Sequence, residues 1–410
     1  MTYQQTIDYL FRSLPMYQRV GSVAYKKDLS NTLKLCELLG NPHQKIKTVH
    51  IAGTNGKGSS AHMLAAILQS AGYKTGLYTS PHLKNFTERI KINGEEINEE
   101  AVVGFVDENK IHFEAIKPSF FETTVAMAFD YFATNKVDIA VIEVGLGGRL
   151  DSTNIITPLV SLITNIGYDH QQMLGESLGE IAKEKAGIIK QNVPVIIGER
   201  HVETQEVFLQ MAKEKSAPIK FASDNVAFYR NDFELDLKGE YQIKNLQGVI
   251  EVTKVLNDIE YYINKEHIKV GIENTSKLTG IKGRWQILDA FPLTICDTAH
   301  NSEGISAVFE QLLSLNYEKL HIVWGMVNDK EINKILKLLP KEANYYFCQP
   351  NVPRGMDVVE LNDNATKIGL RGLCVKKVNE AIKIAKEKAS PEDLIYIGGS
   401  TFVVAEIDGL

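Results

Sequence analysis

The sequence contains few cysteines and no long apolar run, and these absences exclude several classes of protein. Four cysteines among 410 residues, with no C-x-x-C pair, argue against a disulfide framework and against a zinc site. No apolar run is long enough to span a bilayer, and the N-terminal residues lack the basic and apolar regions of an export signal. We therefore expect a cytoplasmic protein whose cysteines are core thiols: Cys36, Cys296, Cys348 and Cys374.

A strong excess of charge is also absent. The formal net charge is −6 and no run of like charges forms a tail, so there is no electrostatic reason to expect nucleic acid as a partner. The 410 residues exceed the size of one compact core, and we therefore expect two domains.

Short β-rich apolar runs alternate with helical patterns along most of the chain. Buried strands that alternate with helices predict mostly parallel, doubly wound sheets, which bind ligands beyond the carboxyl ends of their strands. The segment KLTGIKGR, residues 277–284, interrupts this series, so we predict domains at 1–280 and 285–410. The predicted strands are 48–52, 75–79, 138–144, 159–166, 194–197, 293–296, 320–324, 345–348 and 394–397, and the predicted helices include 60–71, 123–134 and 303–313.

The stretch IAGTNGKGSS, residues 51–60, follows the first strand and opens a helix. Glycines let successive N–H groups point into one concavity, and Lys57 adds a full positive charge suited to a β- or γ-phosphate. The loop departs from the general phosphate-loop signature, because Ile51 replaces its first glycine and Gly58 follows the lysine. The alternative is a tight turn with an exposed lysine. The helix itself is predicted to be amphipathic, with one apolar face formed by Leu64, Ile67, Leu68 and Ala71.

Acidic and histidine side chains follow two of the predicted strands. Glu143 lies at the carboxyl end of the apolar strand 138–144, where phosphate-loop proteins hold magnesium. Asp169 and His170 follow the strand 159–166. His170 either contacts metal or phosphate or is a solvated loop residue. The glycines that follow Glu143 do not form a dinucleotide-binding motif, because Leu150 stands where its last glycine belongs.

Lys185 occupies an unexpected position on a helix. Ser177 and Glu180 form the pattern of a capping box, so a helix should start there. Leu178, Ile181 and Lys185 then fall on one face, where an apolar residue is expected at position 185. A buried ammonium is costly unless it is paired, deprotonated or chemically changed. The alternative is a lysine that extends its charge to water.

Several motifs, in order along the chain, resemble those of the folylpolyglutamate synthase/dihydrofolate synthase family, which belongs to the ATP-dependent amide-bond ligases that include the Mur ligases. They are HIAGTNGKGSS, YTSPHLKNFTERIKING, FFETTVAMAFDYFA, VIEVGLGGRLDSTNII, ITNIGYDHQQMLGESLGEIAKEKAGIIK, KGRWQIL, CDTAHN and IYIGGSTFVVAEI. The resemblance implies a phosphate-loop α/β domain and a smaller, doubly wound α/β domain that carries part of the glutamate site. It also implies a reaction in which ATP phosphorylates a folate or dihydropteroate carboxylate and the amine of L-glutamate attacks the acyl phosphate.

The resemblance implies a role for individual residues as well. For ATP these are Gly53, Thr54, Asn55, Gly56, Lys57, Gly58 and Ser59 at the phosphates, Asn245 near the adenine, and Arg284 and Asp297 from the second domain. For Mg²⁺ they are Ser80, Glu143, His170 and Lys185, the last matching a lysine that the family carbamylates. His300 and Ser400 would line the glutamate site, and Arg89 and Phe121 would lie near the folate. The residues expected to act in catalysis are Lys57, Lys185, Asp297 and His300.

Two positions depart from the family pattern. Tyr241 stands where the family usually has histidine, and Thr298 stands where it has glycine. Two alternatives to this family are a Mur-type ligase acting on a UDP-sugar peptide and a phosphate-loop switch protein that hydrolyses nucleotide. We further expect a monomer whose partners are small-molecule substrates, with neither nucleic acid nor membrane.

Overall fold

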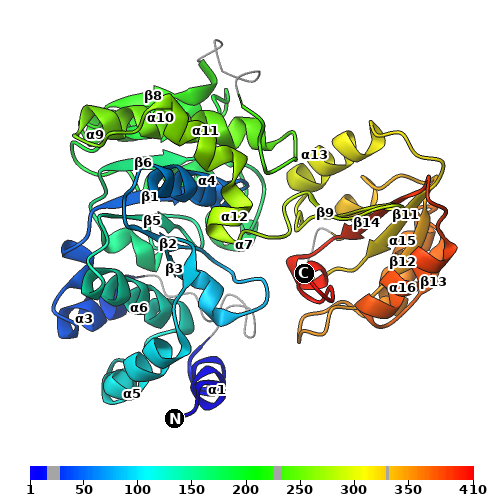
Figure 1. Ribbon diagram of the computed structural model, residues 1–410, viewed down its shortest axis with the longest axis horizontal. Coiled ribbons are helices and arrows are strands. Elements are labelled where there is room, and N and C mark those ends of the chain that lie inside the picture. Colours follow the sequence, from blue (N-terminus) through cyan, green and yellow to red (C-terminus); the bar gives the residue numbers. More distant parts are fainter. Residues whose placement is uncertain (16–27, 225–232, 329–331) are drawn as a thin grey trace. The chain divides into compact units, whose positions relative to one another are not determined.

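The computed structural model describes residues 1–15, 28–224, 233–328 and 332–410 (Figure 1). The chain divides into two compact units. The first comprises Met1–Asp236 and Gln242–Gly280, and the second comprises Leu237–Tyr241 and Ile281–Leu410. The chain therefore passes between the units at three points, and the last of these follows Gly280, within the interruption noted in the sequence. The short excursion at 237–241 was not anticipated.

The first unit contains an eight-stranded sheet with the order β4-β3-β2-β5-β1-β6-β7-β8. β1 lies in parallel between β5 and β6, so the phosphate-loop strand has neighbours on both sides. β3 and β4 are antiparallel and form one edge. The strands are β1 Thr48–Ala52, β2 Thr75–Tyr78, β3 Ile90–Ile92, β4 Glu95–Glu96, β5 Ile139–Glu143, β6 Val160–Ile163, β7 Val195–Ile197 and β8 Ile219–Phe221.

Helices cover both faces of this sheet (Figure 1). One apolar cluster packs α1, α3, α5 and α6 against β2 and β5, and another packs α8 and α9 against β1, β6 and β7. α4 and α10 pack on strands of the same sheet. The helices are α1 Tyr3–Ser13, α3 Ser30–Leu38, α4 Lys57–Ser70, α5 Glu99–Ile116, α6 Phe120–Thr134, α7 Gln171–Leu174, α8 Leu178–Ala186, α9 Gln205–Glu214, α10 Gln242–Asp258, α11 Lys265–Glu273 and α12 Thr275–Thr279, with 3₁₀ turns η2 Pro42–Gln44, η3 Phe86–Arg89, η4 Ser152–Ile155 and η5 Ala222–Asp224.

The prediction of an amphipathic helix after the phosphate loop is wrong. α4 begins at Lys57, and every residue from Ser59 to Leu68 is buried. The sheet covers one side of the helix, while α10, α11 and α12 cover the other. A helix covered on all sides has no face left for solvent, so its buried surface is not confined to one stripe.

The second unit contains a six-stranded sheet with the order β13-β12-β11-β14-β10-β9. All neighbours are parallel except β9, which pairs antiparallel with β10 at the edge. The predicted fold class, two mostly parallel α/β sheets, is confirmed. The strands are β9 Gln286–Ala290, β10 Leu293–Cys296, β11 Leu320–Trp324, β12 Asn344–Phe347, β13 Gly372–Cys374 and β14 Leu394–Gly398, and the helices are α13 Ser302–Leu313, α14 Ile332–Leu336, α15 Val358–Lys367, α16 Val378–Lys388 and α17 Thr401–Ala405.

The four cysteines are free thiols. Cys36, Cys296 and Cys348 are buried, as predicted, but Cys374 is exposed. The expectation of a core thiol is wrong at that position because Cys374 lies in β13, the exposed edge strand of the second sheet. Within the described ranges, no helix is both long enough and apolar enough to cross a membrane.

Candidate active site

The phosphate loop has the backbone shape that its glycines suggested. Gly56 is the N-cap residue of α4 and has a φ of 82°, a conformation that side chains rarely adopt. A Cβ at Gly56 would lie 2.0 Å from Oδ1 of Asn245, so the side-chain amide of Asn245, in α10, is in direct contact with this turn. α4 starts at Lys57, and its first N–H groups lack helical partners and are available to an anion.

The loop is braced by the segment that follows β6. The Thr54 hydroxyl donates to the carbonyl of Gly167 at 3.1 Å and accepts from the amide of Gly167 at 2.9 Å. The amide of Asn55 donates to Oδ1 of Asn165 at 2.8 Å, and the Thr164 hydroxyl donates to the Asn55 carbonyl at 2.6 Å. The Thr54 hydroxyl therefore acts as both donor and acceptor in holding the loop's shape.

Side chains at the start of α4 and of α10 make further contacts beside the loop. Nζ of Lys57 donates to the carbonyl of Thr54 at 2.9 Å. The Ser59 hydroxyl accepts from Nε2 of Gln242 at 3.1 Å, and Oε1 of Gln242 accepts from Nδ2 of Asn245 at 2.8 Å. Gln242 is completely buried and was not identified from the sequence. The available signal was a second amide one helical turn before Asn245.

Glu143 and Ser80 are brought together at the carboxyl edge of the sheet. Glu143 is 5% exposed, and its Oε2 accepts from the amide of Ser80 at 3.0 Å. Glu143 is also paired in register with Ile51, at the start of the phosphate loop. The carboxylate therefore lies between the candidate phosphate loop and the loop that begins with Ser80.

These donors fit a magnesium ion. Carboxylate and hydroxyl oxygens are its preferred ligands, and it usually retains water and binds phosphate oxygens in addition to one or two carboxylates. Among the residues that the structure describes, no cluster of three or more histidine, cysteine, aspartate or glutamate side chains could hold a metal alone. A partial protein shell beside a phosphate loop is therefore the arrangement that suits Mg²⁺ with nucleotide.

His170 lies after β6, as the sequence predicted, and caps the short helix α7 with a φ of 49°. Its Nε2 is 3.6 Å from Oδ1 of Asp169, and the side chain is 36% exposed. The histidine is thus accessible at the same sheet edge, and its role as a metal ligand stays a prediction.

Lys185 is buried in the first unit. Its side chain is 4% exposed and Nζ donates to the carbonyl of Gly53 at 2.9 Å, so the alternative of a lysine extended to water is wrong. The helix that carries it, α8, has the predicted capping box of Ser177 and Glu180. The pKa of Lys185 is lowered to about 7, chiefly by burial and also by the charge of Lys57, while Asp169 and Asp151 oppose the change.

Asp297, in the second unit, is buried and its carboxylate accepts three hydrogen bonds. Its Oδ2 accepts from the Tyr241 hydroxyl and from the amide of Trp285, both at 2.6 Å, and its Oδ1 accepts from the amide of Ala299 at 2.8 Å. Burial raises the pKa of the Asp297 carboxyl, while the Tyr241 hydrogen bond, the charge of Arg284 and the two amides oppose the rise. Tyr241, one of the two departures from the family pattern, therefore has a defined partner.

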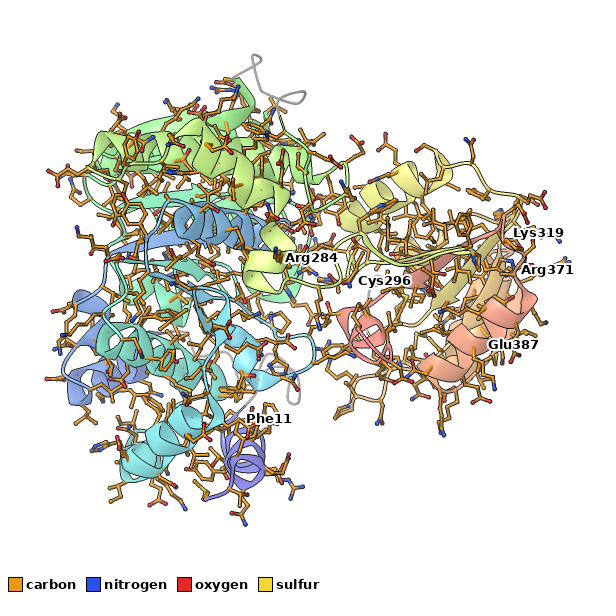
Figure 2. The ribbon with its side chains drawn as sticks, in the orientation of Figure 1. Phe11, Arg284, Cys296, Lys319, Arg371 and Glu387 are labelled. Atoms are coloured by element: carbon orange, nitrogen blue, oxygen red, sulfur yellow. The ribbon has the colours of Figure 1, made fainter. Side chains whose placement is uncertain are left out.

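Thr298, the other departure, is also accommodated. Its amide donates to the carbonyl of Gly283 at 3.0 Å, and its hydroxyl accepts from the guanidinium of Arg284. Arg284 lies in the segment that leads to β9, and Cys296 ends β10 just before Asp297; both are labelled in Figure 2. The added side chain at position 298 thus orients the arginine.

His300 and Ser400 follow β10 and β14, which are parallel neighbours. His300 is exposed, and its Nδ1 lies 3.0 Å from the carbonyl of Thr298, to which the ring can donate. Ser400 is 3% exposed, and its hydroxyl accepts from the amide of Phe402 as the N-cap of α17. Both residues therefore lie at one edge of the second sheet, and neither role in glutamate binding is tested by these contacts.

Arg89 ends the loop that starts at Ser80. It is 3% exposed, its Nε donates to Nδ1 of His82 at 2.7 Å, and its guanidinium carbon lies 5.2 Å from the centre of the Phe120 ring. Burial lowers the pKa of Arg89, and Tyr78 and Glu143 oppose the change. His82 and Phe120 were missed by the sequence analysis, although both lie in motifs that carry the family resemblance.

Phe121 lies beside the glycine loop that follows β5. A Cβ at Gly145 would be 2.3 Å from Cζ of Phe121, and the ring centre is 6.3 Å from that of Tyr78. The two residues predicted to contact folate, Arg89 and Phe121, therefore come from segments adjoining Glu143.

Comparison with known families agrees with this geometry. The Mur ligase middle domain matches residues 51–256, and the Mur ligase glutamate ligase domain matches residues 283–401. A dihydrofolate synthase/folylpolyglutamate synthase of Bacillus subtilis is 31% identical over 411 residues, which cover 93% of this chain and 94% of the relative.

The chain belongs to the folylpolyglutamate synthase/dihydrofolate synthase family of Mur ligases.

A second relative is longer than this ligase. A probable bifunctional folylpolyglutamate synthase/dihydropteroate synthase of Haloferax volcanii is 30% identical over an alignment 440 residues long, which covers 99% of this chain and 50% of the relative. This ligase thus spans about half the length of that relative and nearly the full length of the Bacillus one.

Two solved structures have the same fold. One is Escherichia coli FolC in complex with DHPP and ADP, with a TM-score of 0.88, 27% identity, and coverage of 99% of this chain and 96% of that chain. The other is a bifunctional folylpolyglutamate synthase/dihydrofolate synthase with Mn, AMPPNP and L-glutamate bound, with a TM-score of 0.85, 28% identity and coverage of 99% and 97%. The expected family, its ATP-dependent ligase class and its need for nucleotide and divalent cation are confirmed. The alternative of a switch protein is rejected.

Proposed function

We propose that this ligase uses ATP to join L-glutamate to the carboxylate of a folate or a pteroate. The observation that carries the proposal is the loop at residues 80–89. At its start, the Ser80 amide donates to Glu143, and at its end lies the buried guanidinium of Arg89. Residues that would bind the cation and the phosphates therefore adjoin residues that would bind an anionic, aromatic acceptor. The same feature favours a folate or pteroate over a UDP-sugar peptide, because an arginine among aromatic rings suits a flat ring system with a carboxylate.

The first step is phosphoryl transfer. An oxygen of the acceptor carboxylate forms a bond to the γ-phosphorus as the bond from that phosphorus to the β–γ bridging oxygen breaks, and ADP leaves. This step needs alignment and charge neutralisation more than a protein nucleophile. Lys57 and the amides of the loop at residues 53–59 hold the phosphates. Magnesium, held by Ser80, Glu143 and His170, would neutralise charge on the phosphate oxygens.

The second step is aminolysis. The amine nitrogen of L-glutamate attacks the acyl carbon, the carbon–oxygen bond to phosphate breaks, and the nitrogen loses a proton as the amide forms. We assign His300 and Ser400 to the glutamate. Arg284 acts at the nucleotide, and Asp297 acts mainly as a positioning residue, because its oxygens hold the amide of Trp285, the next residue after Arg284.

Lys185 is proposed to be carbamylated. A carbamate forms when an unprotonated amine adds carbon dioxide and loses a proton, which replaces a buried cation by an anion. The burial of Nζ against the Gly53 carbonyl, in the phosphate loop, supports a group whose oxygens would hold a second magnesium.

Cytoplasmic location and a monomeric state also stay predictions, and light scattering would measure the oligomeric state.

The test is an ADP-release assay with dihydropteroate and tetrahydrofolate offered separately, each with and without L-glutamate. We expect release only when acceptor and glutamate are both present. Release at the same rate without glutamate would contradict the proposal. The acceptor that supports turnover identifies which of the two activities, or both, the ligase has.

A further inference from the structure

Lys91 is a buried lysine that the proposed reaction does not use. It lies in β3, is 4% exposed, and its Nζ donates to the carbonyl of Thr279 at 2.9 Å. Nζ also lies 3.7 Å from Oε1 of Glu96 in β4. A buried ammonium costs free energy unless it is paired, and the Thr279 carbonyl and Glu96 supply the partners of Lys91.

The carbonyl that Lys91 holds belongs to the last residue of α12. Gly280 follows as the C-cap residue, and the first unit ends there. The last carbonyls of a helix have no helical partner, and a cation beside them is favourable. Lys91 therefore fixes the backbone at the point where the chain leaves the first unit for the last time.

A second contact supports this arrangement independently. The turn between β3 and β4 contains Gly94, whose φ is 81°. A Cβ at Gly94 would lie 2.1 Å from the carbonyl oxygen of Leu278. The β3–β4 hairpin thus meets the end of α12 through its turn as well as through Lys91.

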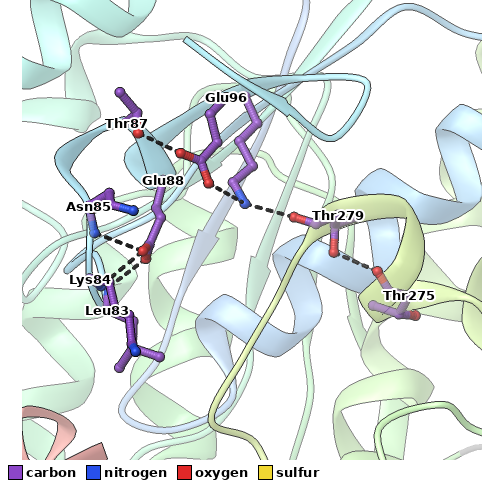
Figure 3. A network of polar contacts seen from close by, with 9 residues as sticks. Leu83, Lys84, Asn85, Thr87, Glu88, Glu96, Thr275 and Thr279 are labelled. Carbon is purple, nitrogen blue, oxygen red and sulfur yellow. Dashed lines mark hydrogen bonds and ion pairs between the residues drawn. The ribbon is translucent and has the colours of Figure 1, made fainter. Parts of the chain in front are cut away.

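The same hairpin is joined to the loop at residues 80–89 (Figure 3). Glu96 accepts a hydrogen bond from the Thr87 hydroxyl, within η3. The next residue, Glu88, accepts from three backbone amides of the loop, those of Leu83, Lys84 and Asn85. One continuous set of polar contacts therefore runs from this loop, through Glu96 and Lys91, to Thr279.

We propose that Lys91 is a positioning residue that couples the loop at residues 80–89 to the chain crossing at Gly280. By its hydrogen bond to the Thr279 carbonyl, Lys91 restricts the directions in which the chain can leave the first unit. This restriction narrows the range of positions open to the second unit. Its consequence for turnover rests on the proposed function, because only a ligase that uses residues of both units needs this restriction.

The experiment compares the parent with Lys91→Met, which keeps the length of the side chain and removes its charge. Spin labels are placed at Glu108→Cys in the first unit and Glu387→Cys in the second, both exposed positions, with the exposed Cys374 changed to serine. We expect a broader distribution of label distances and at least about tenfold faster amide exchange at residues 279–282. We also expect kcat to fall about tenfold while the KM for ATP changes little.

Lys74→Met is the matched control, since Nζ of Lys74 also donates to a helix C-cap carbonyl, that of Asn135 after α6. It should leave label distances and exchange at 279–282 unchanged, and Lys91→Arg should restore most of the parental behaviour. Should Lys91→Met not fold, Glu96→Gln weakens the same link and should shift both readouts in the same direction. The inference is overturned if the distances and exchange match the parent, or if Lys74→Met alters them equally. A parent without ligase activity would refute the proposed function alone, because neither readout depends on turnover.

Discussion

At the scale of single residues, Lys185 and Lys57 are two cations beside one loop with different surroundings. Lys185 is buried against the Gly53 carbonyl, while Lys57 bonds the Thr54 carbonyl from a partly exposed position. Two ammonium groups so placed repel each other, and the charge of Lys57 lowers the pKa of Lys185. An unprotonated Lys185 is the form that can react with carbon dioxide.

The first prediction concerns Lys185. Lys185→Ala should lose most activity, and a short carboxylate added in solution should restore part of it by occupying the vacated space. Lys185→Arg should stay inactive, because it keeps a charge but cannot form a carbamate. Initial rates of ADP release measure both effects. Lys183→Ala, on the exposed side of the same helix, is the control and should keep the parental rate. An active Lys185→Arg variant would show that no carbamate is needed.

The second prediction concerns Lys57. Lys57→Ala should remove ligase activity and leave the fold intact, because its charge aligns phosphate whereas its packing contribution is small. The measurements are kcat/KM and the thermal unfolding curve. If more than about a tenth of kcat/KM survives, a loss below ~1.4 kcal/mol of transition-state stabilisation, Lys57 does not have this role.

At the scale of elements, the phosphate loop depends on the loop that follows β6. The third prediction is that Thr54→Val lowers the free energy of unfolding by about 1–3 kcal/mol, since the polar groups of Gly167 lose their partner. Nucleotide affinity should fall with it, because the loop loses a brace. Denaturant unfolding and nucleotide titration test this. Thr54→Ser keeps the hydroxyl and should behave like the parent. A Thr54→Val variant with the parental stability and nucleotide affinity would contradict the prediction.

At the scale of the whole molecule, the residues predicted to act in the reaction come from both units. The phosphate loop, Glu143 and Lys185 belong to the first unit, whereas Asp297 and His300 belong to the second. We therefore expect changes in the second unit to weaken nucleotide binding less than changes in the phosphate loop do.

The fourth prediction follows from this division. Asp297→Ala and His300→Ala should both lower kcat. The affinity for nucleotide should stay near the parental value in His300→Ala and should fall in Asp297→Ala, because Asp297 positions the segment that carries Arg284. His300 is exposed, so its replacement should leave the unfolding temperature nearly unchanged, whereas Asp297→Ala removes the partner of a buried tyrosine and should lower it. Asp297→Asn keeps a hydrogen-bond acceptor for Tyr241 but removes the charge, so it separates the loss of stability from the loss of turnover. Parental turnover in both alanine variants would exclude these residues from the reaction.

The sequence by itself determined the features that depend on neighbours along the chain. β1, β10 and β11 have the predicted bounds, since each is a short apolar run between turn residues. The capping box of α8 followed from the spacing of Ser177 and Glu180. Helical periodicity placed Lys185 on the apolar face, and the folded structure decided that its ammonium is buried there and does not reach water. The phosphate loop and Glu143 followed from their places after strands.

Only the tertiary structure decided what depends on segments far apart in sequence. The edge strand β9 was missed because its residues are mostly exposed and lack the apolar pattern of a central strand. α4 was predicted to have a solvent face, but α10, α11 and α12, which lie far along the chain, cover it. Lys91 looks like an ordinary strand lysine until the end of α12 brings the Thr279 carbonyl to it. Such burial and pairing are set by chain segments that meet only in the folded state, so local patterns do not contain them.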